Sequence, residues 1–262
     1  MVRAFDAPEP PGAALDVTCS PFCRPMHRLR LLLRSARPLP ATLRHPLVGR
    51  LHAWWGDGNA YHDAPSAYAF GRVRPLDRPS GAATHAWNVG MADPDAALAL
   101  AAGIAAHPEL FPGVPVVGIE ATDAPEVWPA RTFWHTDSPL LLRVGVGQGR
   151  KIHLTWDHPD AAARLADGLR RRLGPLARRA PSAQGADERP GEAVRVGFTA
   201  PGTSFAEDVH GRTCPVSHVG IWVEGPPEAH RSVWACGLGQ NTGLGFGMLA
   251  LLGDDAGAPA AA

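Results

Sequence analysis

A glycine-rich stretch near the end of the 262-residue chain is the clearest candidate for chemistry, because it could bind an anion. Five glycines fall between Gly237 and Gly247, and an apolar run from Phe246 to Leu252 follows. Glycines allow positive φ angles and close approach to the backbone, whose amides can then bind anionic oxygens. A P-loop would need a lysine at its end, and a Rossmann loop would follow the first strand of a domain. The stretch predicts either a phosphate-backbone contact beside a last strand or a tight turn in a β-rich domain.

Other reactive side chains lie in weaker patterns. Cys19, Cys23 and His27 have a spacing that could form one corner of a metal site, but no matching second pair follows. Residues 135–138 read His-Thr-Asp-Ser, yet neighbours in sequence are no evidence for a catalytic triad, since triad geometry is spatial. We therefore expect no metal and no cofactor.

Charge is segregated along the chain although the formal net charge is zero. Counting Arg and Lys against Asp and Glu, residues 1–80 carry +5, residues 81–139 carry −6, residues 140–180 carry +6 and residues 181–262 carry −5. This alternation permits a basic face on a neutral protein. Lys151 is the single lysine, and arginine favours bidentate phosphate contacts, although high-GC coding would also enrich it. The pattern favours a nucleic-acid ligand.

Composition indicates a globular protein of the cytoplasm. The hydrophobic content is 45%, and no apolar run approaches the ~20 residues of a membrane span. The first residues lack the basic-then-apolar pattern of a signal peptide, and four cysteines in a chain of this size do not indicate a disulfide framework.

The periodicity of the first half predicts the order strand, helix, strand, strand, helix, strand. Residues 27–34 alternate as a strand with an apolar back and an Arg-rich front, and residues 43–55 have helical spacing. Further strands over 68–73, 84–91 and 114–122 and a helix over 95–107 complete the order. This order is typical of a ferredoxin-like domain, an antiparallel sheet backed by two helices.

The second half predicts a degenerate copy of the same pattern. Two apolar runs, 140–146 and 151–156, flank a glycine-rich turn, and the helix that starts at Asp157 carries arginines on its outer faces. Strands over 194–199 and 216–224, a short helix over 228–234 and a closing strand to 252 follow. We therefore expect an α+β protein of two tandem ferredoxin-like domains: an irregular leader over 1–22, an N-terminal domain over 23–134, a C-terminal domain with the glycine-rich loop over 135–253, and a disordered tail over 254–262.

These features together resemble the CRISPR-associated RAMP superfamily, and within it the repeat-processing endoribonucleases of the sixth Cas protein family. The stretch Gly237 to Met248 matches that family's G-h-G-x5-G-F-G-h signature, where h is apolar. Other segments are also similar to the family, although each is weak evidence alone: residues 39–52, 61–70 and 133–143 and the helix over 157–173. The Arg-rich helix favours a divergent type IV variant, and so does the absence of a lysine that the family carries just before the Phe of its second strand.

The resemblance implies RRM-like RAMP domains and metal-independent cleavage of a CRISPR repeat RNA hairpin. A 2′-hydroxyl attacks the adjacent phosphate of the precursor crRNA, which leaves a 2′,3′-cyclic phosphate and a 5′-hydroxyl. The mature crRNA would stay bound and join an effector complex with other CRISPR subunits. This chemistry needs a base, an acid and a cation, and histidine suits the first two because its ordinary pKa lies near neutrality.

The same resemblance implies candidate catalytic residues. The family's catalytic histidine lies eight positions before the Phe of its second strand, where this chain has His62 before Phe70. His52 stands where the family has a tyrosine on its first helix, and Tyr68 stands where it has a lysine. His45, one or two helical turns before His52 on a neighbouring face, is a further base candidate. Three arginines could replace the missing lysine: Arg44, Arg50 and Arg72.

The residues expected to bind RNA come from the first strand, the helix over 157–173, the glycine-rich turn near residue 147 and the glycine-rich loop. A solvated helix face and an ordinary hairpin are the alternative readings of the two middle groups. The set is Arg28, Arg30, Arg34, Arg44, Arg50, Arg72, Arg143, Arg150, Lys151, Arg164, Arg170, Arg171, Arg172, Gly237, Gly239, Gly243, Gly245 and Gly247.

Two other functions stay open at this point. The missing lysine favours a non-cleaving RAMP subunit that binds crRNA structurally. An unrelated α+β metabolic enzyme, whose glycine loop binds a small anion, would show no affinity for hairpin RNA.

Overall fold

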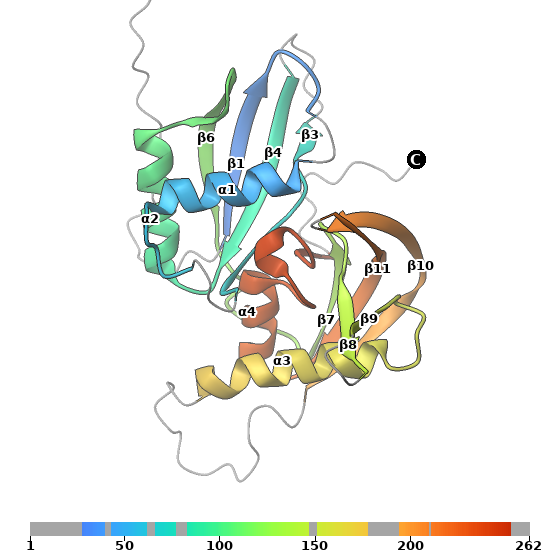
Figure 1. Cartoon of the computed structure of the whole chain (residues 1–262). Helices are drawn as coiled ribbons and strands as arrows, with labels where there is room; N and C mark the ends of the chain where they lie inside the picture. Colours follow the sequence, from blue (N-terminus) through green and yellow to red (C-terminus); the bar gives the residue numbers. More distant parts are fainter. Residues whose placement is uncertain are drawn as a thin grey trace, which may run out of the picture.

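The structure is a computed structural model that describes residues 28–39, 43–61, 66–76, 83–146, 151–177, 194–209 and 211–252. Two larger antiparallel sheets, each backed by two helices, make up the two halves of the molecule (Figure 1). The predicted α+β fold of two ferredoxin-like halves is confirmed. Among the described residues, no helix is long and apolar enough to cross a membrane.

The first half packs two helices on one face of its sheet (Figure 1). Its elements are β1 (Arg28–Ser35), α1 (Arg44–Trp55), β2 (Tyr68–Phe70), β3 (Arg74–Leu76), β4 (Ala83–Met91), α2 (Pro94–Ala106), β5 (Glu109–Phe111) and β6 (Val114–Thr122). The strand order is β2-β4-β1-β6-β5, and β3 also pairs with β4. Leu29, Leu31 and Leu33 alternate along β1 and are buried with α1 and α2, as the alternation predicts.

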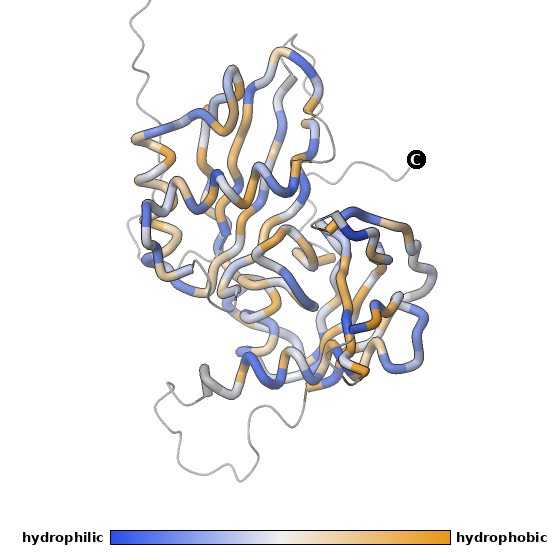
Figure 2. Tube along the Cα trace, viewed as in Figure 1, coloured by the Kyte–Doolittle hydropathy of each residue, from blue (hydrophilic) through white to orange (hydrophobic). Residues whose placement is uncertain are grey.

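The second half repeats this topology and adds a hairpin. Its elements are β7 (Arg131–Thr136), β8 (Leu142–Gly145), β9 (Lys151–Leu154), α3 (Ala161–Ala177), β10 (Arg195–Val209), β11 (Arg212–Glu224), α4 (Pro227–Cys236), the short 3-10 helix η1 (Thr242–Leu244) and β12 (Leu249–Leu251). The order β12-β7-β11-β10 corresponds to β6-β1-β4-β2 of the first half. In Figure 2, hydrophobic residues lie along the strands of both sheets, and hydrophobic and hydrophilic residues alternate along α3.

Several boundaries differ from the sequence prediction; the helix expected over 157–173, for example, is α3 over Ala161–Ala177. β7 starts at Arg131, so the second half begins before residue 135. The strand expected over 68–73 ends at Phe70, and a separate strand, β3, follows at Arg74–Leu76, beyond the expected range. β10 continues to Val209 instead of ending at residue 199, and β11 starts at Arg212 instead of residue 216. The sequence Ala-Pro-Gly-Thr-Ser that follows residue 199 gives no apolar alternation.

The outer parts of β10 and β11 form a two-stranded arm. β7 pairs with β11 over Gly220 to Glu224, whereas residues 203–209 and 212–218 pair with each other. The arm is tied to the rest of the second half by the bridge between Leu140 and Ser217 and by packing against Phe246. The glycine-rich loop therefore lies between the arm and the first half.

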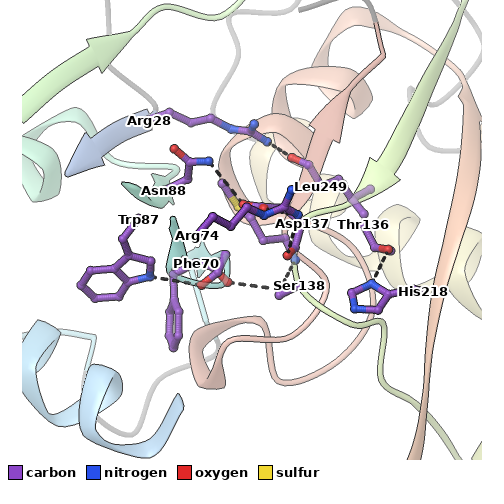
Figure 3. Close-up of polar contacts among 12 residues, drawn as sticks. Arg28, Phe70, Arg74, Trp87, Asn88, Thr136, Asp137, Ser138, His218 and Leu249 are labelled. Carbon is purple, nitrogen blue, oxygen red and sulfur yellow. Dashed lines mark hydrogen bonds and ion pairs between the residues drawn. The ribbon is translucent and has the colours of Figure 1, made fainter. Parts of the chain in front are cut away.

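Arg28 joins the two halves (Figure 3). Its Nε donates to Trp234 O at 2.7 Å and its Nη2 donates to Leu249 O at 2.5 Å. The guanidinium also lies 3.9 Å from the centroid of the Trp234 ring. The alternation of β1 correctly places Arg28 on the face away from α1 and α2, but α4 covers this end of the face. Arg28 is consequently buried.

Replacing Arg28 with alanine should lower the free energy of unfolding by about 3 kcal/mol, because two buried carbonyls lose their donors and a cation–π contact is lost. Arg34→Ala, at the exposed end of the same strand, should leave that free energy unchanged. Urea unfolding followed by tryptophan fluorescence measures both variants. Equal effects would show that Arg28 does not tie the halves together.

Candidate nucleic-acid interface and active site

The glycine-rich loop folds back on itself where the two halves meet. Leu238 N donates to Gly247 O at 2.8 Å, and Gly247 N donates to Pro139 O at 2.8 Å. Gly247 has a φ of +64°, and a Cβ at this position would collide with the Leu238 carbonyl. Only glycine fits this closure of the loop.

The loop also binds the strand β2 of the first half. Thr242 Oγ1 donates to Tyr68 O at 3.0 Å, and the Tyr68 hydroxyl donates to Gly243 O at 3.2 Å. Gly245 lies so close to the Phe70 ring that a side chain would collide with it. The loop is therefore a contact between the halves.

Three glycine amides of the loop donate hydrogen bonds to backbone carbonyls of the protein itself. Gly237 N donates to Val233 O, Gly245 N to Thr242 O and Gly247 N to Pro139 O. These three amides are not directed at a ligand. RNA contact by Gly237, Gly239, Gly243, Gly245 and Gly247 stays a prediction.

His52 lies near the end of α1, with its ring between Asn59 and Tyr68. The orientation of the Asn59 amide follows from its partners: Nδ2 donates to Gly56 O at 2.8 Å, and Oδ1 accepts from Tyr61 N at 3.2 Å. His52 Nδ1, 3.3 Å from Asn59 Oδ1, must therefore carry a proton and donate it. His52 Nε2 lies 3.1 Å from the Tyr68 hydroxyl.

The Tyr68 hydroxyl can serve both protonation states of His52. It donates to Nε2 of the neutral imidazole, or accepts from the imidazolium while it donates to Gly243 O. Burial raises the pKa of Tyr68 to about 12, so the hydroxyl stays protonated at neutral pH. Tyr68 thus lacks the charge of the lysine it replaces in the sequence pattern. Both ring nitrogens of His52 are engaged, and a substrate would have to displace one partner.

His45 and His52 lie on the outer face of α1, opposite the buried Leu47 and Leu51. Seven residues separate them, which corresponds to about 10.5 Å along the helix axis. Gly49 lies between them on the same face, with open space where a side chain would be. Packing does not explain this glycine, which is an unfavourable residue inside a helix.

His62, the main catalytic candidate, lies outside the described residues. The nearest described residues before and after His62 are Tyr61 and Ser66, and both lie near Tyr68. The Tyr61 ring centroid is 6.4 Å from that of Tyr68, and Ser66 and Tyr68 both border Gly243.

Two arginines and a carboxylate form an ion-pair cluster between the halves. Arg44 Nη2 lies 2.5 Å from Glu207 Oε2, and Arg72 Nη2 lies 2.7 Å from Glu207 Oε1. Burial lowers the pKa of Arg44, while the Glu207 charge acts in the opposite direction. A pocket beside this cluster is lined by Leu43, Leu47, Phe70, Val73 and Gly245 as well as by the two arginines.

Asp137 and Ser138 add further bonds between the halves (Figure 3). Arg74 Nη2 lies 2.7 Å from Asp137 Oδ1. Ser138 Oγ donates to Phe70 O at 3.2 Å and accepts from Met248 N at 3.0 Å. These side chains hold β2, β3 and the glycine-rich loop together.

His218 lies beside this group and is neutral at physiological pH. Its Nδ1 is 2.9 Å from Thr136 Oγ1, which also accepts from Val219 N at 3.2 Å. Burial, followed by the charges of Arg72 and Arg74, lowers the pKa of His218 to about 4.

Comparison with known proteins connects this arrangement to solved structures. No protein-family model matches the sequence, and neither does any curated protein. A Cas6-related protein of Pyrococcus furiosus has 18% sequence identity and a TM-score of 0.69, covering 87% of this chain and 99% of that chain. A RAMP protein described as binding different RNA substrates has 18% identity and a TM-score of 0.69, and a CRISPR-associated protein Cas6 has 14% and 0.68; each covers 86% of this chain and 99% of its own. The chain has the Cas6 fold.

Several of the arginines expected to bind RNA hold this Cas6 fold together. Arg143 reaches the loop side chains of Gln240 and Asn241, each at 2.9 Å, and Arg172 Nη1 donates to Gly237 O at 2.7 Å. Arg170 pairs with Asp167 and also donates to a backbone carbonyl, and Arg50 donates to the carbonyl of Glu109. Together with Arg28, these residues have structural partners, and their contact with RNA stays a prediction.

Other expected RNA contacts are open to solvent. Arg34, Lys151, Arg164 and Arg171 are exposed. Arg164 and Arg171 are seven residues apart and therefore share one face of α3. Arg30 is 3.7 Å from Glu120, and Arg150 lies outside the described residues.

Sequence reasoning missed Glu207 and His218 as parts of the site. Both lie on the arm, and their partners come from distant segments, so no local spacing identifies them. Within the described ranges, no group of three or more His, Cys, Asp or Glu side chains could hold a metal ion. The pattern of Cys19, Cys23 and His27 lies outside those ranges.

The lowered pKa of His218 predicts a pH-dependent stability. The folded imidazole takes up a proton only near pH 4, whereas the unfolded one does so near pH 6.5. Between these values the unfolded chain binds more protons, so the free energy of unfolding should fall as the pH is lowered from about 6.5 to about 4. His218→Asn should flatten this fall, measured as the melting temperature by circular dichroism at each pH. Parallel curves for parent and variant would refute the assignment.

Proposed function

We propose that this chain is a RAMP protein that binds CRISPR repeat hairpin RNA and cleaves it. The supporting observation is the Cas6 fold, which matches over 86% of this chain. One solved structure with this fold, at a TM-score of 0.59 and 14% identity, is described as a Cas6 product complex. The cleaved product would be a mature crRNA that stays bound and joins other CRISPR effector subunits.

The proposed reaction is metal-independent attack of a 2′-hydroxyl on the neighbouring phosphate. His62 supplies one of the two proton-transfer groups, and the outer face of α1, with His45 and His52, supplies the other. Tyr68 positions His52. Since Tyr68 carries no charge, the cation that stabilises the phosphorane must come from Arg44 or Arg72.

RNA outside the cleavage site would bind the exposed cations of the second half. Arg164 and Arg171 on α3 and Lys151 on β9 are available for backbone phosphates. Shape and phosphate contacts dominate recognition of double-stranded RNA, so binding should weaken as salt is raised.

A non-cleaving RAMP subunit is the second candidate, because both ring nitrogens of His52 are engaged and an uncharged tyrosine replaces the lysine. Incubation of the purified protein with its cognate repeat RNA in EDTA separates the two functions. Cleavage to a 2′,3′-cyclic phosphate supports the enzyme. Binding without cleavage supports the structural subunit, and absence of binding refutes both.

The histidine variants identify the proton-transfer groups. His62→Ala should slow cleavage by about 100-fold or more without loss of RNA affinity, because general acid–base catalysis contributes on that order. His45→Ala and His52→Ala are compared with it in single-turnover assays. The control is His107→Ala, an exposed histidine at the end of α2. Unchanged cleavage by His62→Ala would remove the main assignment.

Gly49→Ala tests whether the RNA crosses the outer face of α1. The variant should raise the free energy of unfolding by about 0.5–1 kcal/mol, because alanine favours helix and nothing occupies the space. If the RNA backbone lies close to this glycine, cleavage should fall by about tenfold or more. A variant that is more stable and fully active would place the RNA elsewhere.

A further inference from the structure

The carboxylate of Glu207 is shared by two guanidinium groups, so the cluster retains one unbalanced positive charge. All three side chains are partly accessible to solvent, with exposed fractions of 21% for Arg44, 32% for Arg72 and 20% for Glu207. We propose that Arg44 and Arg72 form a binding site for one phosphate of an RNA backbone, and that Glu207 occupies this site until the phosphate displaces it. The inference rests on the proposed RNA binding.

Both guanidinium groups have contacts that do not depend on Glu207. Arg44 Nε donates to Gly245 O at 3.2 Å, and the guanidinium lies 4.0 Å from the centroid of the Phe246 ring. Arg72 lies 5.6 Å from the centroid of the Phe205 ring. Arg44 therefore keeps a hydrogen bond and a ring contact when the carboxylate leaves, and Arg72 keeps its ring contact, so both cations remain near the site for an anion.

Glu207 lies in the outer part of β10, where β10 pairs with β11 alone. It is two residues before the turn of the arm. Rotation of its side chain is sufficient to free the two guanidinium groups. Displacement would also remove the ion pairs that tie the arm to α1 and to the segment after β2.

A phosphodiester is the anion that fits this site. It carries the same single charge as the carboxylate and also presents two oxygens, so it can replace both ion pairs. Neighbouring charges do not compete, because Asp137 is already paired with Arg74. The RNA strand brings further contacts of its own to other cations, which favours the exchange.

The test removes the internal anion and measures affinity for two probes. Glu207→Gln should bind inorganic pyrophosphate about tenfold more tightly than the parent by calorimetry, because the site is no longer occupied. Its affinity for the cognate repeat RNA, measured by fluorescence anisotropy, should rise by about threefold or more. Adding Arg72→Gln to this variant should abolish both gains.

Glu224→Gln is the matched control, since Glu224 pairs with Arg131 and Arg195 at the other end of the same two strands. It should show neither gain. If Glu207→Gln melts too low to assay, Glu207→Ala, which also removes the internal carboxylate, should show the same gains.

The outcomes separate this inference from the proposed function. RNA binding and cleavage with no gain for Glu207→Gln over Glu224→Gln would overturn the phosphate site and leave the function standing. A pyrophosphate gain without any RNA binding would refute the function and keep an anion site. A pyrophosphate gain with unchanged RNA affinity would overturn the RNA backbone as its ligand.

Discussion

The close contact between the glycine-rich loop and β2 is the constraint on which the site depends. Main-chain atoms of the loop meet Tyr68 and Phe70 directly, because Gly243 and Gly245 leave no room for a side chain. α1 and the arm both border this contact, α1 through Arg44 and the arm through its packing on Phe246. The histidines of α1 and the cations of the cluster therefore keep their places only while the two halves remain together.

Much of the fold could be predicted from the sequence, because alternation and helical spacing reflect burial directly. Leu29, Leu31 and Leu33 are buried as predicted, and α1 and α2 lie within one residue of the expected ranges at each end. The arm could not be predicted. Its outer part has little apolar alternation, and its strands are held by pairing with each other and by contacts with distant residues.

The candidate site was less predictable, since its residues meet across the two halves. The family resemblance named His52 and Tyr68 as separate catalytic candidates, and in the structure they are in hydrogen-bond contact. It gave no indication that Glu207 lies between Arg44 and Arg72, because more than 130 residues separate the carboxylate from either partner. Nor did it show that Arg28, Arg143 and Arg172 bind carbonyl or amide groups of the protein. An arginine count identifies a basic protein, but only the packing decides which arginines are available.

The bond from Arg28 to Leu249 has a consequence for synthesis of the protein. It connects the first described strand with the last, across 221 residues. Until α4, the glycine-rich loop and β12 have been synthesised, the first half lacks both Arg28 acceptors and the loop beside Tyr68. An incomplete or truncated chain would therefore present separate halves without an assembled site. Assembly of the candidate site therefore requires both halves, because its residues come from each of them.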